Sequence, residues 1–194
     1  MKKLSRDELM SLEQYATERA DFRAKVIAHK KHRQVQIGEH ATLYFEDRLT
    51  MQYQIQEMLR VERIFEASGI QEELDAYNPL IPHGSNWTAT FMIEYADENE
   101  RKVALAKLIG IEDKVWVQVE GFDKVYAIAD EDLERNTEEK TSAVHFLRFE
   151  LTEGMVAGLK DAAAINIGIE HENYTFDVTP VPPGTRDSLR GDID

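Results

Sequence analysis

The chain has 194 residues, a formal net charge of −14 and no cysteine. The lack of thiols excludes disulfide frameworks, thiolate-held metal centres and cysteine nucleophiles. The acidic balance disfavours broad contact with nucleic-acid phosphates or anionic lipid, because such binding requires Lys and Arg to neutralise charge. The charged N-terminus lacks the apolar segment of a secretory signal, and no stretch approaches the roughly 20 apolar residues that span a bilayer. We therefore expect a soluble, cytoplasmic protein with no nucleic-acid or membrane partner.

The first third of the chain predicts helices followed by a hairpin. Ser5 and Glu8 have capping-box spacing, which predicts that the first helix starts there. A second helical stretch follows and ends in basic residues that lie between Arg19 and Arg33. This basic run is typical of a solvated helix face that complements acidic surface in the same molecule, and the alternative is a docking surface for an acidic partner. Residues 34–37 and 41–45, separated by a glycine, predict a β-hairpin.

The remaining elements follow from periodicity, caps and breakers. A helical pattern runs from 47 to 66, and Gly69 beyond it favours a left-handed C-terminal cap. Asp97 and Thr152 have the character of helix N-caps, and Gly110 stands at a helix stop. The other predicted elements are a helix over 71–77, strands over 87–95 and 143–151, hairpins over 115–128 and 165–178, and a charged connector over 130–140.

These elements predict the fold class α+β, with a mostly antiparallel sheet of short strands and hairpins and helices packed on it. A long, largely buried central helix over 47–66 is part of this prediction. Residues 1–179 are expected to form a single domain. Residues 180–194 combine tandem prolines with few apolar side chains and no period, which predicts a flexible, disordered C-terminal tail.

The central helix carries acidic residues where its apolar pattern predicts burial. On a helical wheel Gln54, Glu57 and Glu62 fall within the apolar arc. A carboxylate buried alone costs several kcal/mol, so these two glutamates require cationic partners, hydrogen-bond donors, a metal or a cavity. One interpretation is that arginines provide the partners, and the other is a polar pocket with this helix as its floor. The wheel leaves a narrow solvent strip: Gln52, Gln56, Arg60 and Arg63.

Arginine partners for these glutamates come from three places in the chain. The candidates are Arg23, Arg48 and Arg148. Arg148 stands on a mostly apolar strand, and we expect it to pair with Glu57 or Glu62.

Catalytic and metal-binding motifs are weak in this chain. The sequence contains no nucleophile elbow, Walker loop, dinucleotide-binding glycine pattern or His-Glu-x-x-His motif. His29 and His32 have i, i+3 spacing, but their neighbours are cations that repel a metal. The acidic start of the 130–140 connector imitates a calcium loop but lacks its turn glycine, which favours a solvated connector. We expect no cofactor, and the alternative is a divalent metal such as iron, manganese or zinc.

Four motifs resemble a bacterial family catalogued as domain of unknown function 3501. The motifs are Phe45–Arg48 with Thr50, Gln54–Arg60 with Glu62, Glu73–Leu74 with Tyr77–Asn78, and His145 with Arg148–Phe149, and the resemblance covers nearly the whole chain apart from the tail. The resemblance brings no established activity. It implies an accessory role beside rubrerythrin-like and iron–sulfur redox proteins, hence a redox partner protein. A chain without cysteine cannot hold an iron–sulfur cluster by its own thiolates.

The sequence therefore favours a non-catalytic binding or accessory module with a polar pocket on the central helix. One alternative is a metal-dependent enzyme or metal carrier that uses Glu57, Glu62 and histidine. Another is a small-molecule enzyme in which a glutamate of raised pKa acts as acid or base. The candidate ligand-binding residues are Glu46, Arg48, Gln54, Glu57, Arg60, Glu62, Tyr77, His145 and Arg148.

Overall fold

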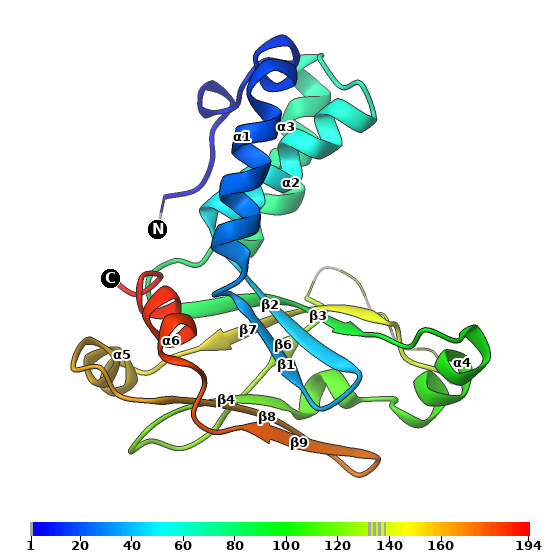
Figure 1. Cartoon of the computed structure of the whole chain (residues 1–194), viewed down its shortest axis with the longest axis vertical. Helices are drawn as coiled ribbons and strands as arrows, with labels where there is room; N and C mark the ends of the chain where they lie inside the picture. Colours follow the sequence, from blue (N-terminus) through cyan, green and yellow to red (C-terminus); the bar gives the residue numbers. More distant parts are fainter. Residues whose placement is uncertain (1, 132, 134, 136, 138) are drawn as a thin grey trace.

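The structure is a computed structural model that describes residues 2–131, 133, 135, 137 and 139–194. It consists of a β-rich body from which an arm of three helices projects (Figure 1). The arm contains α1 (Leu12–Lys30), α2 (Arg48–Val61) and α3 (Ala67–Tyr77), and a 3₁₀ turn η2 (Asn78–Leu80) leads from the arm to the body. Among the described residues, no helix combines the length and apolarity needed to cross a membrane.

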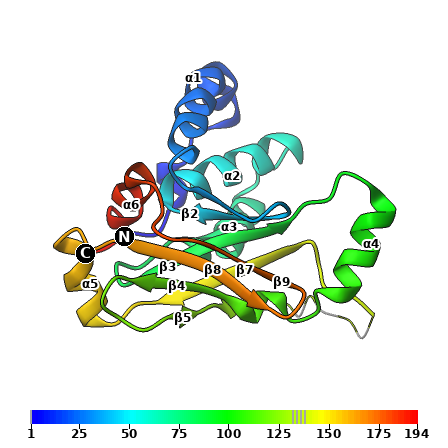
Figure 2. The same cartoon turned by 60° about the horizontal axis from the view of Figure 1, so that its bottom comes forward.

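Two antiparallel sheets form the body. The first has the order β1-β2-β3-β7-β6 and the second β5-β4-β8-β9. A single hydrophobic core contains residues of both sheets, so their inner faces pack on one another (Figure 2). The strands are β1 (Gln34–Ile37), β2 (Ala41–Glu46), β3 (Asn86–Ile93), β4 (Val115–Val119), β5 (Val125–Tyr126), β6 (Ile128–Ala129), β7 (Val144–Glu150), β8 (Ile165–His171) and β9 (Tyr174–Val178).

Three further helices lie at the margins of the body: α4 (Glu98–Lys107), α5 (Glu153–Lys160) and α6 (Pro183–Arg190) (Figure 1). The Asp97 carboxylate accepts hydrogen bonds from two backbone N–H groups of α4, and the Thr152 hydroxyl accepts one from α5. Gly110 has a φ of 82°, as a helix stop requires. The predicted α+β class, the antiparallel pairing and the hairpins β1–β2, β4–β5 and β8–β9 are confirmed.

The first helix differs from its prediction. The capping box of Ser5 and Glu8 is present, but it closes only one 3₁₀ turn, η1 (Arg6–Glu8). The α-helix begins six residues later, where the Ser11 hydroxyl accepts the Gln14 N–H, and it then runs without interruption to Lys30. The two predicted helical stretches are therefore one helix, because Ser11 provides a second cap and no breaker follows it.

The helix predicted over 47–66 is present, but it is shorter and less buried than expected. α2 ends at Val61, where Arg63 adopts a left-handed φ of 54°, while Gly69 lies inside α3. Val61 is 62% exposed and Phe65 is 72% exposed. The physical reason is that α2 belongs to an arm of three helices, whose small core buries only one stripe of each helix.

The C-terminal segment is ordered rather than a flexible tail. The Val181 N–H donates to the Ile165 carbonyl, and the Trp87 indole donates to the Leu189 carbonyl at 3.0 Å. Leu189 is fully buried. The tandem prolines start a helix here, because a fixed φ and a missing N–H are favourable in the first helical turn. The few apolar side chains suffice because they point into the body.

Arg33 joins the C-terminal segment to the base of the arm. Its guanidinium is almost fully buried and donates to both carboxylate oxygens of Asp192, at 2.5 and 3.2 Å. It also donates to the carbonyls of Phe45 and Glu46, each at 3.0 Å. One buried side chain thus holds strand β2, the end of α1 and the C-terminus together.

Candidate functional site

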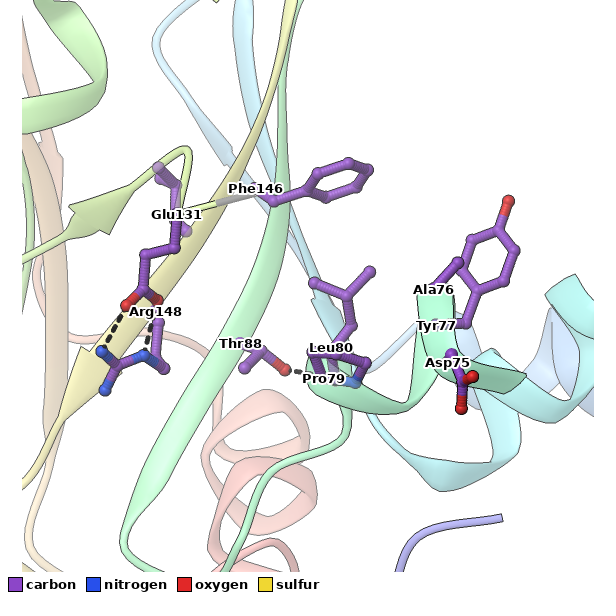
Figure 3. A pocket seen from close by; sticks show the side chains of 10 residues that line it. Asp75, Ala76, Tyr77, Pro79, Leu80, Thr88, Glu131, Phe146 and Arg148 are labelled. Carbon is purple, nitrogen blue, oxygen red and sulfur yellow. Dashed lines mark hydrogen bonds and ion pairs between the residues drawn. The ribbon is translucent and has the colours of Figure 1, made fainter. Parts of the chain in front are cut away.

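A pocket of about 500 Å³ lies where the arm meets the outer face of the five-stranded sheet (Figure 3). The register of β3 and β7 pairs Thr88 with Arg148 and Thr90 with Phe146. Strand alternation places these side chains on the outer face, whereas His145 and Leu147 are buried beneath it. The lining residues are Asp75, Ala76, Tyr77, Pro79, Leu80, Thr88, Glu131, Phe146, Leu147 and Arg148.

A short hydrogen bond fixes one wall of the pocket. The Thr88 hydroxyl donates to the Leu80 carbonyl at 2.5 Å, and this contact holds η2 against strand β3. The prolyl ring of Pro79 stands in the first turn of η2, where its missing N–H costs nothing. Tyr77 and Asp75 from α3 then lie at the opposite end of the pocket from Arg148 (Figure 3). The wall on the arm side is therefore preformed.

The charged end of the pocket is an ion pair. Arg148 donates from Nε and Nη2 to the two carboxylate oxygens of Glu131, each at 2.8 Å, and from Nη1 to Glu150. The hydrogen bonds from Arg148 hold the pKa of Glu131 below its usual range. The lining thus contains two carboxylates, Asp75 and Glu131, against one guanidinium. This charge balance favours a positively charged group over an anion.

The expected pairing of Arg148 with Glu57 or Glu62 is wrong. Glu57 lies in the arm, where Arg19 donates to its two carboxylate oxygens at 2.7 and 2.8 Å and the Tyr15 hydroxyl donates at 2.6 Å. Glu62 caps the C-terminal end of α2 and is exposed. The interpretation that an arginine pairs with the embedded glutamate is correct for Glu57, with Arg19 as that arginine. Glu57 is not among the residues that line the pocket described above.

Glu57→Gln is expected to lower the free energy of unfolding by about 1 to 2 kcal/mol at pH 7. Hydrogen bonds from Arg19 lower the pKa of Glu57 from 4.5 to about 2. The expected loss of stability is smaller than this shift alone implies, because Arg19 is partly exposed and solvent screens the ion pair. The lowered pKa stabilises the fold above pH 4.5, and this contribution is lost as the pH falls towards 2. Urea unfolding of both chains at pH 7 and pH 3 should show a smaller difference at pH 3. An equal difference at both pH values would contradict the ion-pair account.

The remaining predicted residues are spread over several environments. Tyr77 and Arg148 line the pocket, and the Gln54 amide donates to the Tyr77 hydroxyl at 3.4 Å. Glu46 accepts from the Thr90 hydroxyl at 2.7 Å on strand β2. Of these four residues, only Tyr77 and Arg148 line the pocket.

Arg48, Arg60 and Gln56 of the predicted helix do not line the pocket. Arg48 pairs with Glu8 at 2.7 Å beside the N-terminus, and Arg60 is exposed. Gln56, expected on the solvent strip, is fully buried. Its side-chain oxygen accepts from the Met10 N–H, and its side-chain nitrogen donates to the Met10 carbonyl. The wheel could not predict this, because the N-terminal segment that covers Gln56 is distant in sequence.

A second cluster lies behind the same strand, on the inner face of β7. Glu112, Asp130 and His145 bring one ligand atom each to within 4.8 Å of one another. His145 is fully buried and Glu112 nearly so. The His145 Nδ1 lies 2.6 Å from Asp130 Oδ2, and Nε2 lies 2.9 Å from the Thr141 hydroxyl and 3.8 Å from Glu112 Oε2. The cluster joins three segments that are distant in sequence.

Comparison with known sequences and structures identifies the family. Residues 3–193 match a family described as "Protein of unknown function (DUF3501)". The chain belongs to this family. No curated protein is significantly similar to it. A crystal structure from Burkholderia pseudomallei, described as a novel protein of unknown function, is 55% identical, covers 100% of both chains and superposes with a TM-score of 0.94.

In this DUF3501 protein His145 lies beside two carboxylates that the sequence did not indicate as its partners. Asp130 was expected to begin a solvated connector, but its side chain is mostly buried and its φ of 52° turns it toward His145. Residues 132, 134, 136 and 138 of that predicted connector lie outside the described residues. Glu112 follows Gly110 in the turn η3 (Ile111–Lys114) and gave no spacing signal. Alternation along β7 places His145 on the same face as buried Phe149. This alternation was the one sequence signal that His145 faces the core.

Proposed function

We propose that this protein is a non-catalytic binding module, and that its ligand occupies the pocket between the arm and the five-stranded sheet. The observation that carries the proposal is the pocket itself, since a concave site of about 500 Å³ lies within the range of small-molecule sites. The accessory role beside a redox partner protein that the family resemblance implies is part of this proposal. It rests on that resemblance alone.

The lining indicates the chemistry of the ligand. Leu80, Pro79 and Ala76 provide aliphatic surface, and the rings of Tyr77 and Phe146 provide aromatic surface. An apolar body buried on these groups gains about 25 cal/mol for each Å² removed from water. Glu131 is paired with the one guanidinium of the lining, so Asp75 leaves a net negative charge that favours a cationic head group. We therefore propose a small molecule with an aromatic or aliphatic body and an amine.

The test compares probes that share one skeleton. We expect phenethylamine to shift amide resonances of Tyr77, Thr88 and Arg148 in an NMR titration, and 3-phenylpropionate to bind more weakly, because the carboxylates repel it. Ala76→Trp fills the pocket from an exposed helical position and should weaken phenethylamine binding by about tenfold or more. Ala24→Trp, at an exposed position of α1, is the matched control for the helical cost of tryptophan and should bind as the parent chain does.

Two results contradict the proposal. If the carboxylate probe binds as tightly as the amine, the charge argument is wrong. If Ala76→Trp binds phenethylamine as tightly as Ala24→Trp does, the pocket is not the site.

A further inference from the structure

The inner face of strand β7 carries a second constellation that the proposed binding function does not use. It consists of His145 on β7, Glu112 on η3, and Asp130 with Thr141 and Ser142 from the segment between β6 and β7. Among the described residues, Glu112, Asp130 and His145 form the one group of three or more His, Cys, Asp or Glu side chains whose ligand atoms all lie within 4.8 Å of one another.

His145 Nε2 and three oxygen atoms around it form a group of four metal-donor atoms. Around Nε2 lie the Thr141 hydroxyl at 2.9 Å, the Ser142 carbonyl at 3.1 Å and Glu112 Oε2 at 3.8 Å. The Thr141 hydroxyl and Glu112 Oε2 are 3.5 Å apart. Metal–ligand bonds of about 2.1 Å place neighbouring donors about 3.0 to 3.4 Å apart in octahedral or tetrahedral geometry. The measured separations bracket this range.

The other ring nitrogen has the partner that metal-binding histidines require. Nδ1 lies 2.6 Å from Asp130 Oδ2, and the tautomer that donates its Nδ1–H to this carboxylate directs Nε2 at the other three donors. Arg135 lies 3.3 Å from the second oxygen of Asp130 and fixes that carboxylate in turn. This is the carboxylate–histidine pair that accompanies metal ions in many proteins, assembled here from a strand and a distant loop.

Burial gives the constellation an electrostatic reason. Glu112 and Asp130 bring two carboxylates into a region where His145 and Thr141 have almost no exposure. Arg135 already lies against Asp130, and a divalent cation held by Glu112 and His145 adds a second positive charge to this buried group. We propose that this site binds one first-row divalent transition-metal ion through His145 Nε2, Glu112, the Thr141 hydroxyl and the Ser142 carbonyl, with Asp130 as the residue that orients the histidine. One nitrogen with oxygen donors suits Mn²⁺, Fe²⁺ or Zn²⁺.

The site is separate from the pocket and from the glutamates that the sequence suggested for a metal. Glu57 is committed to Arg19 in the arm, and Glu62 is exposed. The pocket lies on the outer face of β7 and the metal constellation on the inner face. Failure of the amine titration therefore leaves the metal site unaffected, and the reverse also holds.

The experiment uses the full chain, purified without an affinity tag and freed of metal with a chelator. We expect titration calorimetry with Zn²⁺ to give about one equivalent. Glu112→Gln and Thr141→Val should each weaken binding by about tenfold or more, because the first replaces a charged ligand by a neutral amide, the second removes a hydroxyl ligand, and both keep the side-chain shape. His171→Gln is the matched control, since His171 is a buried strand histidine whose Nε2 contacts the Ile109 carbonyl. Its affinity should equal that of the parent chain.

A measurement on the unmutated chain guards against variants that fail to fold. Substoichiometric Mn²⁺ should broaden the amide resonances of Thr141, Ser142 and His145 before those of the pocket residues. The inference is overturned if the parent chain binds no metal, if Glu112→Gln and Thr141→Val bind as His171→Gln does, or if broadening occurs elsewhere. An absence of metal binding together with two ring N–H protons on His145 would show that the cluster is an imidazolium held between carboxylates.

Discussion

A chain that ends at Pro180 is expected to lose cooperative thermal unfolding. The deleted segment contains Val181 and Leu189, both buried, whose loss costs about 2 and about 3 kcal/mol respectively. It also contains Asp192, and its removal leaves the Arg33 guanidinium buried without that carboxylate, at a cost of about 3 to 5 kcal/mol. The sum of about 8 kcal/mol or more is comparable with the whole stability of a domain, about 5 to 15 kcal/mol.

Differential scanning calorimetry of the shortened and full chains measures this effect. The control is Asp187→Ala in the full chain, because Asp187 lies on the exposed side of α6 and its removal should change stability by less than about 0.5 kcal/mol. A shortened chain that melts cooperatively near the temperature of the full chain would show that the C-terminal segment contributes little.

Arg33→Met is expected to lower the free energy of unfolding by about 3 to 5 kcal/mol. The substitution leaves the Asp192 carboxylate buried and removes the donors to the Phe45 and Glu46 carbonyls. Urea unfolding at pH 8 is the measurement. Burial raises the pKa of Asp192 to about 6 even though Arg33 opposes this shift, and the carboxylate is fully ionised only above that pH.

Two further variants separate the effect of the buried charge on stability from the effect of side-chain packing. Arg33→Met combined with Asp192→Leu should recover part of the loss, because the buried Asp192 charge is removed with its partner, while the two carbonyls lack their donors and Asp47 loses Arg33 and retains His29. Arg186→Met is the matched control, since Arg186 is partly exposed and pairs with its neighbour Asp187. A loss for Arg33→Met no greater than for Arg186→Met would contradict the role of Arg33 as the junction of arm, sheet and C-terminus.

Local chemistry made much of the secondary structure predictable. The Asp97 and Thr152 caps, the left-handed glycine at 110 and the alternating pairs 165–169 and 174–178 act within a few residues, so the sequence alone specifies them. The same chemistry misled at Ser5 and Gly69. A capping box can close a single turn, and a glycine can lie inside a helix when another residue, here Arg63, adopts the left-handed conformation.

The candidate sites were predictable only in part. Tyr77 and Arg148 were selected from the sequence and line the pocket, and His145 was selected and lies in the second cluster. Their partners Glu131, Glu112 and Asp130 were not selected. The reason is distance along the chain: the contact between His145 and Glu112 depends on how β7 packs over η3, which no spacing within either segment encodes.

The sequence by itself determined the α+β class, the antiparallel hairpins and the absence of any thiol chemistry, since these follow from residue type and short-range periodicity. Only the tertiary structure decided which apolar faces are buried and which charges meet. An apolar stripe looks the same whether it faces a large core or a three-helix arm, so Phe65 is exposed while Leu189, in a segment expected to be mobile, is buried. Burial is a property of the packing partner, and that partner lies elsewhere in the chain.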